Sequence, residues 1–295
     1  LVIENKMSPG GIIAISILAG KLLAPFESMM SLWHNIKHAF DAMGKLEKAA
    51  QLYDQSQEKE IELPEPKGDI EFEKVYYQII VGNKPIPIIK SVDLKIAAGE
   101  VITIFGKNAA GKSSLARLLA GVVRPTSGVV RLDGADICAW QDEQINKYVG
   151  FLPQETELFS GTVAENIAKL NNKAKAHMVI ESAKFTEAHE VILRFPKGYQ
   201  TDLSDLQSPL SNGLLRRVAL ARAFFGHPKL VILDEPNLHL DQEGDNAIVN
   251  IIARARQKKI TLIIISHRNE ILKVSDKLIY MEEGRVKAYG NTEKF

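Results

Sequence analysis

The sequence predicts an α/β fold built around a parallel sheet, and three segments support that prediction. Two runs, residues 230–234 and 262–265, are continuously apolar, which is typical of parallel strands covered on both faces. A third apolar run, residues 101–105, leads into a glycine-bounded loop, and residues 114–120 behind it have helical spacing. A strand, a loop and a helix in this order form the unit from which parallel sheets are assembled.

The loop at residues 106–113 reads Gly-Lys-Asn-Ala-Ala-Gly-Lys-Ser and fits the phosphate-loop pattern Gly-x-x-x-x-Gly-Lys-Ser/Thr. Its N–H groups and the helix dipole behind it favour phosphate. The pattern alone arises by chance in about one chain in a hundred of this length, but the flanking strand and helix argue against a plain glycine turn. We expect Lys112 to reach the β- and γ-phosphates of a nucleotide and Ser113 to bind Mg²⁺. The expected nucleotide-binding residues are Gly106, Lys107, Asn108, Ala109, Ala110, Gly111, Lys112, Ser113 and Ser114.

Composition bounds the remaining possibilities. The 295 residues are 45% hydrophobic and 25% charged, so a packed core in one large or two modest domains is expected. The formal net charge of +1 gives no global electrostatic case for nucleic acid. The single cysteine, Cys138, excludes an internal disulfide and suits a reducing compartment. Because the chain begins with Leu1, we expect a piece of a longer polypeptide, without a signal peptide.

The N-terminal stretch allows two interpretations. Residues 7–20 carry no charge, and 14 uncharged residues fall in the range where a buried core helix is commoner than a membrane span. Clustered glycines at Gly10, Gly11 and Gly20, with Lys21 near one end, favour a membrane helix. The residues alone leave both interpretations open.

Residues 29–53 predict a long helix with one apolar stripe, which packs either on the chain's own core or on helices outside this sequence. The polar residues 55–62 and then Pro64 and Pro66 end the helical pattern. We therefore expect a boundary between residues 1–62 and 63–295. The stripe comprises Met29, Trp33, Ile36, Phe40, Met43, Leu46, Ala50 and Tyr53.

Further elements follow from alternation and turn residues. Residues 70–105 predict β-structure with a turn at Gly82, and residues 129–132 and 148–152 predict short strands. Residues 162–226 are mostly helical in pattern.

Two carboxylates follow the strand at residues 230–234. Asp234 and Glu235 would lie at the carboxyl edge of the sheet, where ligands of open α/β sheets bind. Alone they would indicate an acidic turn. Together with the phosphate loop they predict a Mg²⁺ ligand in Asp234 and a residue that polarises the attacking water in Glu235.

Residues 209–223 read Pro-Leu-Ser-Asn-Gly-Leu-Leu-Arg-Arg-Val-Ala-Leu-Ala-Arg-Ala and resemble the signature of the ABC-transporter ATPase domain, Leu-Ser-Gly-Gly-Gln followed by a basic helix. Gln154 matches the family's Q-loop, Asp241 its D-loop and His267 its switch histidine. The resemblance implies an ABC-type P-loop NTPase fold, with a RecA-like parallel core sheet, an antiparallel β subdomain and a helical subdomain. It also implies that ATP and Mg²⁺ bind between two head-to-tail copies of the chain.

The resemblance assigns roles residue by residue. Glu235 is expected to be the general base, Gln154 to complete the metal and water shell, and His267 to hold the γ-phosphate. The signature residues Ser211, Asn212 and Gly213 and the D-loop residue Asp241 are expected to bind ATP, and Ser211 and Gly213 would serve the ATP of the partner chain.

A narrower resemblance concerns residues 8–33 and 151–167, which look like type I secretion ATPases, exporters similar to those for bacterial proteases and haem-binding proteins. It implies a homodimer in the bacterial inner membrane with its ATPase domain in the cytoplasm. Residues 1–62 would be the last membrane helix and linker of a truncated membrane domain. A periplasmic adaptor, an outer-membrane channel and a secreted polypeptide cargo would be the partners, and no nucleic acid. The alternatives are an exporter of lipid or peptide, a soluble ABC ATPase with a non-transport role, and a nucleotide-binding scaffold without turnover.

Three departures from the family pattern lead to expectations. Asn108, Ala109 and Ala110 stand where the family usually has Ser-Gly-Ser or Asn-Gly-Ala. A left-handed alanine would cost about 1–2 kcal/mol, so ordinary dihedral angles are predicted at Ala109 and Ala110. Asn212 replaces the first signature glycine and Leu214 the glutamine. Asparagine tolerates left-handed geometry, so we expect the fold to survive. Tyr76 and Tyr77 are candidates for stacking on adenine, with half-exposed strand residues as the alternative.

Overall fold

The computed structural model describes residues 9–57, 63–82, 84–203, 212–238, 240 and 242–292. It divides into two compact units, Leu1–Glu60 and Ile61–Phe295, so the division falls near the predicted boundary after residue 62. Two predicted site residues, Ser211 and Asp241, lie outside the described residues.

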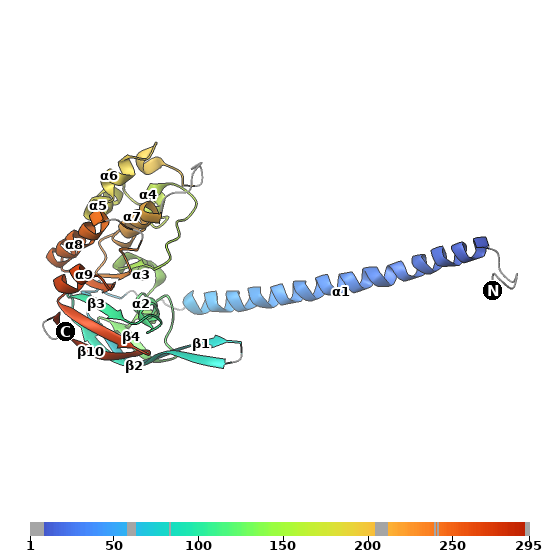
Figure 1. Cartoon of the computed structure of the whole chain (residues 1–295), viewed down its shortest axis with the longest axis horizontal. Helices are drawn as coiled ribbons and strands as arrows, with labels where there is room; N and C mark the ends of the chain where they lie inside the picture. Colours follow the sequence, from blue (N-terminus) through green and yellow to red (C-terminus); the bar gives the residue numbers. More distant parts are fainter. Residues whose placement is uncertain are drawn as a thin grey trace. The chain divides into compact units, whose positions relative to one another are not determined.

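The described part of the first unit is one helix, α1 (Pro9–Gln57), which runs without interruption through Pro25 (Figure 1). The apolar and the striped stretches of the sequence therefore join in one element. Large side chains of the stripe, such as Trp33 and Phe40, are exposed. Among the described residues, none of the helices combines the length and the apolar character that a bilayer span requires.

The second unit contains a six-stranded sheet in the order β10-β9-β3-β8-β7-β6. The five strands from β9 to β6 run parallel, and β10 is antiparallel to β9, so the predicted parallel sheet is confirmed. Its strands are β3 (Val101–Gly106), β6 (Val149–Leu152), β7 (Leu230–Asp234), β8 (Thr261–Ile265), β9 (Lys277–Glu282) and β10 (Arg285–Asn291).

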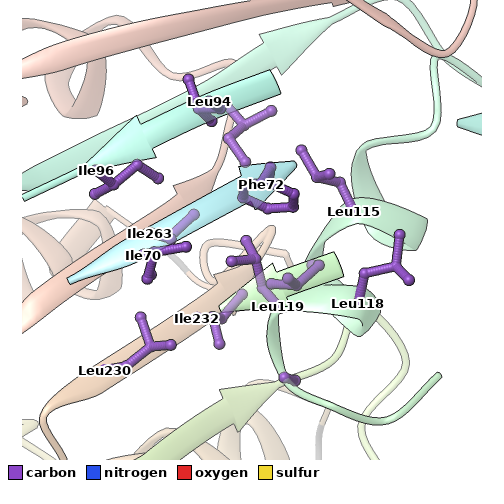
Figure 2. Packing of buried hydrophobic residues seen from close by; sticks show 14 of the residues in the cluster. Ile70, Phe72, Leu94, Ile96, Leu115, Leu118, Leu119, Leu230, Ile232 and Ile263 are labelled. Atoms are coloured by element: carbon purple, nitrogen blue, oxygen red, sulfur yellow. The ribbon is translucent and has the colours of Figure 1, made fainter. Parts of the chain in front are cut away.

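A second, antiparallel sheet has the order β2-β1-β4-β5. It comprises β1 (Ile70–Val81), β2 (Lys84–Ile96), β4 (Ser127–Leu132) and β5 (Ala135–Asp136), which confirms the strands predicted before and after the phosphate loop. Helix α2 (Lys112–Leu119) contributes its buried leucines to one core with both sheets. Figure 2 shows Leu115, Leu118 and Leu119 of this helix among strand residues such as Phe72 and Ile232.

The opposite face of the parallel sheet packs against α7 (Asn212–Ala223), α8 (Gln242–Gln257) and α9 (Asn269–Val274). Alternate residues of one strand face different cores: Ile232 belongs to the first cluster, and Val231 and Leu233 to the second. Since both faces are covered, these strands are apolar throughout, as their sequence indicated.

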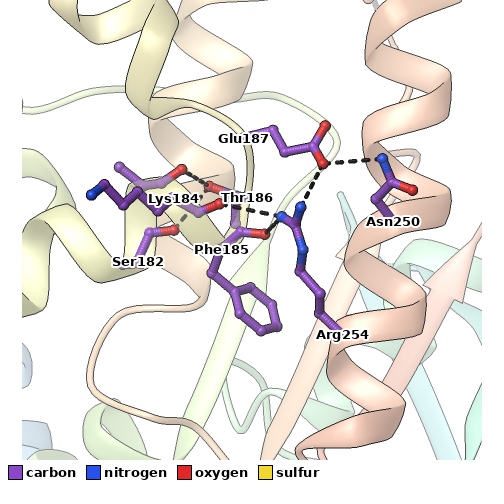
Figure 3. A network of polar contacts seen from close by, with 8 residues as sticks. Ser182, Lys184, Phe185, Thr186, Glu187, Asn250 and Arg254 are labelled. Atoms are coloured by element: carbon purple, nitrogen blue, oxygen red, sulfur yellow. Dashed lines mark hydrogen bonds and ion pairs between the residues drawn. The ribbon is translucent and has the colours of Figure 1, made fainter.

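A third cluster lies within the helical segment, which we define as α4 (Val163–Ile167), α5 (Ala176–Phe185) and α6 (His189–Leu193). Helix α7 contributes Val218 and Ala221 to this cluster and Ala219 and Leu220 to the sheet core, so it joins the two. A second contact joins the helical segment to α8, where Arg254 donates to carbonyl groups at the end of α5 and to the Glu187 carboxylate (Figure 3).

The sequence did not predict several elements, namely α3 (Asp142–Tyr148), α8, α9, β9 and β10. Tyr148 ends α3, although the sequence placed it at the start of a strand. Strand β10 mixes exposed and half-buried positions, so it lacks the continuous apolar run of a central strand. Strand β9 does carry a short apolar run, Leu278 to Met281, which was not used in the prediction.

Candidate nucleotide-binding and catalytic site

The parallel register brings the predicted functional segments to one edge of the sheet. Ile265 of β8 pairs with Ile104 of β3 and with Asp234 of β7, and Leu233 of β7 pairs with Leu152 of β6. The phosphate loop, His267, Glu235 and Gln154 are therefore all attached to neighbouring strand ends. The carboxyl edge of an open α/β sheet is where ligands bind.

Both glycines that bound the phosphate loop are required by close backbone neighbours. Gly106 has φ 148°, and a Cβ there would lie 2.0 Å from the Met281 carbonyl oxygen. Gly111 has φ 94°, and a Cβ there would lie 2.9 Å from the Ile88 carbonyl oxygen. The glycines of the pattern are therefore fixed by the packing of β9 and β2 against the loop.

Ala109 corrects a prediction. Ordinary dihedral angles were predicted at Ala109 and Ala110, yet Ala109 has φ 61°. Left-handed geometry brings its Cβ close to the following carbonyl oxygen, at a cost of about 1–2 kcal/mol. Neighbouring contacts hold the conformation, because Ala110 donates its N–H to the Lys107 carbonyl at 3.2 Å and accepts from the Gly284 N–H at 3.1 Å.

Lys112 lies folded into the loop. Its ammonium donates to the carbonyl oxygens of Gly106 and Lys107 at 2.8 and 2.9 Å. Burial lowers the pKa of Lys112, and the carboxylates of Glu235 and Asp234 act in the opposite direction. The lysine is thus held at the loop's anion-binding side, near both acidic residues.

Asp234 and Ser113 form the predicted metal-binding pair. Asp234 is 2% exposed, and burial raises its pKa, opposed by a hydrogen bond with the Ser113 hydroxyl. Its Oδ1 atom is buried and has no hydrogen-bond partner in the part of the chain that the structure describes. A buried, unpartnered carboxylate oxygen beside a hydroxyl fits Mg²⁺, which takes one or two protein ligands and completes its shell with nucleotide phosphates and water.

Glu235 follows directly in a strained backbone conformation. Its φ is 48°, and its N–H donates to the Ile265 carbonyl oxygen at 2.9 Å. Non-glycine residues at positive φ cluster at functional sites, where the surroundings hold them in place. The Gln154 side-chain amide donates to Glu235 Oε2 at 3.3 Å, so the structure brings these two predicted residues together.

His267 stands two residues beyond the end of β8, next to buried Ser266. The Ser266 N–H donates to the Ile104 carbonyl oxygen at 3.2 Å, which ties this segment to the strand that precedes the phosphate loop. The His267 side chain is exposed, so it remains accessible at the edge of the site.

Comparison with known proteins identifies this arrangement. Residues 89–238 match the model of the ABC transporter family. The chain belongs to the ABC transporter family. The expected resemblance to the ABC-transporter ATPase domain is thereby confirmed, and the matched residues form an ABC ATPase domain.

Among similar proteins within this family are ATP-binding proteins of secretion and translocation systems. The type I secretion system ATP-binding protein PrsD of Rhizobium meliloti is 36% identical over the whole chain. The alpha-hemolysin translocation ATP-binding protein HlyB of Proteus vulgaris and the leukotoxin translocation ATP-binding protein LktB of Mannheimia haemolytica are each 32% identical over 97% and 98% of it. The chain spans 50% of the length of the first and 40% of the other two.

A solved structure agrees with the fold. A bacterial Atm1-family ABC exporter with ATP bound matches with a TM-score of 0.69 at 28% identity, covering 79% of this chain and 41% of that one. The predicted ABC-type fold is therefore confirmed by both the sheet topology and this neighbour.

The structure shows one buried residue beside the candidate site that was not predicted from the sequence. Arg216, in the helix after the signature, is 2% exposed. Its guanidinium donates to the carbonyl oxygens of Pro153 and Gln154 at 2.7 and 2.8 Å, and to those of Asp234 and Glu235 at 2.5 and 2.6 Å. One side chain therefore links the signature helix, the Q-loop and the two acidic residues.

The position of Arg216 on the helix could have predicted its burial. Arg216 shares a face with Ala219, Leu220 and Ala223, at the i+3, i+4 and i+7 positions, and all three are buried. An arginine on the apolar face of a helix needs buried hydrogen-bond acceptors, which here are backbone carbonyls.

The remaining ABC signature residues begin α7. Asn212 is its first residue, so it adopts helical rather than left-handed backbone, and its tolerance does not depend on left-handed geometry. Gly213 follows it. Their contact with a partner's nucleotide stays a prediction.

The adenine-stacking candidates both lie on β1. The Tyr76 hydroxyl donates to Gln78 Oε1 at 3.3 Å, and Tyr77 packs against the first core cluster. Tyr77 pairs with Ile89, whose Cδ1 lies 2.9 Å from where a Cβ on Gly111 would be. Tyr77 is thus next to a neighbour of the phosphate loop, but its stacking role stays a prediction.

Proposed function

We propose that the chain is the ATP-hydrolysing motor of an ABC exporter, the inner-membrane ATPase of a type I protein secretion system. The observation that carries the proposal is that five predicted site residues converge at one sheet edge, namely Lys112, Ser113, Asp234, Gln154 and Glu235. The 36% sequence identity to PrsD along the whole chain supports it.

The chain's own residues suit hydrolysis of a nucleoside triphosphate. Lys112 and the N–H groups that begin α2 would bind phosphate, and Ser113 and Asp234 would hold Mg²⁺, which neutralises charge on the phosphates. Gln154 donates to Glu235 and so orients the carboxylate that would accept a proton from the attacking water. His267, exposed at the same edge, would hold the γ-phosphate.

A head-to-tail homodimer would complete each site. Ser211, Asn212 and Gly213, where α7 begins, would present the positive end of the helix dipole to the partner's ATP, and Asp241 would take part in the same site. Closure on ATP and release after hydrolysis would be the power stroke. Arg216 would couple movement of the signature helix to the Q-loop through its hydrogen bonds to the Pro153 and Gln154 carbonyls. Residues 154–166 would transmit that movement to the membrane domain.

The remaining assignments rest on the relatives. Residues 1–62 would be the end of a membrane domain in the bacterial inner membrane, with the ATPase domain in the cytoplasm. A periplasmic adaptor, an outer-membrane channel and a secreted polypeptide would be its partners.

Mg²⁺-dependent ATP hydrolysis over a range of protein concentrations tests the motor. We expect turnover to rise faster than linearly with protein concentration, and Glu235→Gln to reduce it at least 100-fold while leaving ATP binding intact, since a general base contributes about 10²–10⁴-fold. Glu181→Gln, an exposed glutamate away from the site, serves as the matched control and should hydrolyse ATP at the wild-type rate. Equal turnover by Glu235→Gln and wild type would refute the assigned base.

Secretion is tested separately with the full-length polypeptide. Cells that lack it should retain the cargo, and the wild-type protein should restore export while Glu235→Gln does not. Cross-linking from residues 154–166 to the membrane domain should succeed; a distant position would contradict the coupling route.

A further inference from the structure

The turn between β9 and β10 contacts the phosphate loop at both of its ends. The parallel pairing matches Phe105 with Tyr280 and Gly106 with Met281. The next residues along the two strands, Lys107 and Glu282, form an ion pair with 2.8 Å between Nζ and Oε1. At the other end of the loop, Gly284 donates its N–H to the Ala110 carbonyl.

The turn is itself anchored on the antiparallel sheet. Gly284 has φ 79°, and a Cβ there would lie 2.3 Å from the Ile88 carbonyl oxygen. Its own carbonyl accepts the Lys90 N–H at 2.7 Å. Glu282 therefore belongs to a fixed support rather than to a freely moving turn.

Lys107 transmits this support into the loop. Its carbonyl oxygen accepts both the Lys112 ammonium at 2.9 Å and the Ala110 N–H at 3.2 Å. The hydrogen bond and the charge of Glu282 raise the pKa of Lys107, and Lys107 in turn lowers the pKa of Glu282. Both side chains are thus ionised at neutral pH.

We propose that Glu282 is a positioning residue that acts through Lys107 to hold the phosphate loop in its nucleotide-binding shape before the nucleotide arrives. The proposal rests on the proposed nucleotide site. It accounts for the left-handed Ala109, because a strained conformation persists where the surrounding contacts over-determine it. A preformed loop spends less binding free energy on ordering, so the ion pair would act on nucleotide affinity.

The alternative interpretation, that Lys107 binds phosphate directly, predicts the opposite effect on nucleotide affinity. If Lys107 bound phosphate directly, the Glu282 carboxylate would compete with the nucleotide for it. Removing that carboxylate would then tighten binding, whereas loss of a positioning contact weakens it.

The test is the KM and kcat for MgATP of the full chain and three variants, with thermal unfolding to verify folding. For Glu282→Gln and Lys107→Met we expect KM to rise about two- to fivefold, the range for an exposed ion pair, and for Glu282→Gln less than twofold change in kcat. The charge exchange Lys107→Glu with Glu282→Lys should restore KM to within about twofold of wild type.

A matched control separates this effect from the general loss of an ion pair. Glu65 pairs with Lys229 at the same 2.8 Å, away from the loop, so Glu65→Gln should leave KM unchanged. A KM for Glu282→Gln that falls or stays at the wild-type value, or a charge exchange without recovery, would overturn the positioning role alone. A wild-type chain that binds no MgATP would overturn the proposed function, and the role of Glu282 with it.

Discussion

Two junctions join the helices α4 to α7 to the rest of the second unit, and they are built on different chemistry. The inner junction consists of Arg216, which is buried, and of Arg222 and Lys169, which are half-buried, and all three donate to backbone carbonyls. At the outer junction, Arg254 and Asn250 of α8 contact Glu187 (Figure 3). Lys258, which follows α8, pairs with Glu181 near the surface.

The two junctions differ in how strongly burial changes the pKa values of their cations. Burial lowers the pKa of Arg216 to about 10 and that of Lys169 to about 8, and it also lowers the pKa of Arg222. At the outer junction, the Arg254 and Glu187 side chains are 39% and 31% exposed and form an ion pair of 2.8 Å. The inner junction thus depends on hydrogen bonds from desolvated cations to backbone carbonyl oxygens. The outer junction depends on ion pairs that water and salt screen.

The inner junction also lies where the chemistry would occur. Arg216 binds the backbone at Gln154 and Glu235, whereas Arg254 binds the last carbonyls of α5, at Lys184 and Phe185. The orphan carbonyls at a helix C-terminus are ordinary partners for an arginine. We therefore expect the inner junction to control both stability and turnover, and the outer one to affect stability weakly.

Arg216→Met should have the largest effect. It leaves several buried carbonyls without a donor, so the free energy of unfolding should fall by about 3 kcal/mol. ATP turnover should fall at least tenfold, because Gln154 and Glu235 lose their common tether. Denaturant unfolding and the ATPase assay measure both.

Should Arg216→Met not fold, Arg216→Lys keeps the charge but loses the forked geometry and should give a smaller loss of both. A loss for Arg216→Met no greater than for Arg254→Met would abolish the distinction between the junctions.

Lys169→Met sharpens the comparison through pH. Lys169 donates to the Asn146 and Val149 carbonyls, and its pKa of about 8 in the folded chain lies below the ordinary 10.5. Between these values the unfolded chain binds the additional proton, so the stability of the wild type should rise with pH from about 8 to 10.5, by up to about 3 kcal/mol relative to the variant.

Unfolding at pH 7, 8.5 and 10 measures that difference. Parallel curves for wild type and Lys169→Met would contradict a desolvated lysine.

Arg254→Met and Glu187→Gln should have a modest effect. For an ion pair exposed by about a third, the coupling free energy in a double-mutant cycle should be below about 1 kcal/mol and should shrink in 1 M salt. ATP turnover should stay within about twofold of wild type. A coupling that survives high salt would mean that the outer junction is desolvated after all.

Glu181→Gln should have the smallest effect. Glu181 lies 3.2 Å from Lys258 and 3.9 Å from His227, and all three side chains are close to half exposed or more. The free energy of unfolding should change by less than about 0.5 kcal/mol, as for most surface substitutions. A larger loss, measured by denaturant unfolding, would extend the importance of the outer junction beyond Arg254.

The sequence predicted the site best where its residues are contiguous. The phosphate loop, Asp234 and Glu235 were predicted because a strand, a loop and a helix follow each other directly, and their spacing encodes the geometry. The continuous apolar strands were equally legible, since burial on both faces leaves no polar positions.

Prediction failed where a conformation depends on distant neighbours. Ordinary dihedral angles were expected at Ala109, but the loop is held by Gly284, far along the chain, and takes φ 61° at that alanine. Strand β10 went unpredicted because an edge strand of exposed and half-buried residues resembles many surface segments. Strand β9 is an inner strand, and its short apolar run was not used in the prediction.

The sequence by itself thus determined that the chain holds a phosphate loop, an acidic strand end and a signature helix, because each is written in consecutive residues. The tertiary structure alone decided which backbone groups surround Arg216 and that Glu282 stands beside Lys107. The physical reason is register: the alignment of parallel strands sets which residues meet at the sheet edge, and that alignment is fixed by packing across the whole sheet.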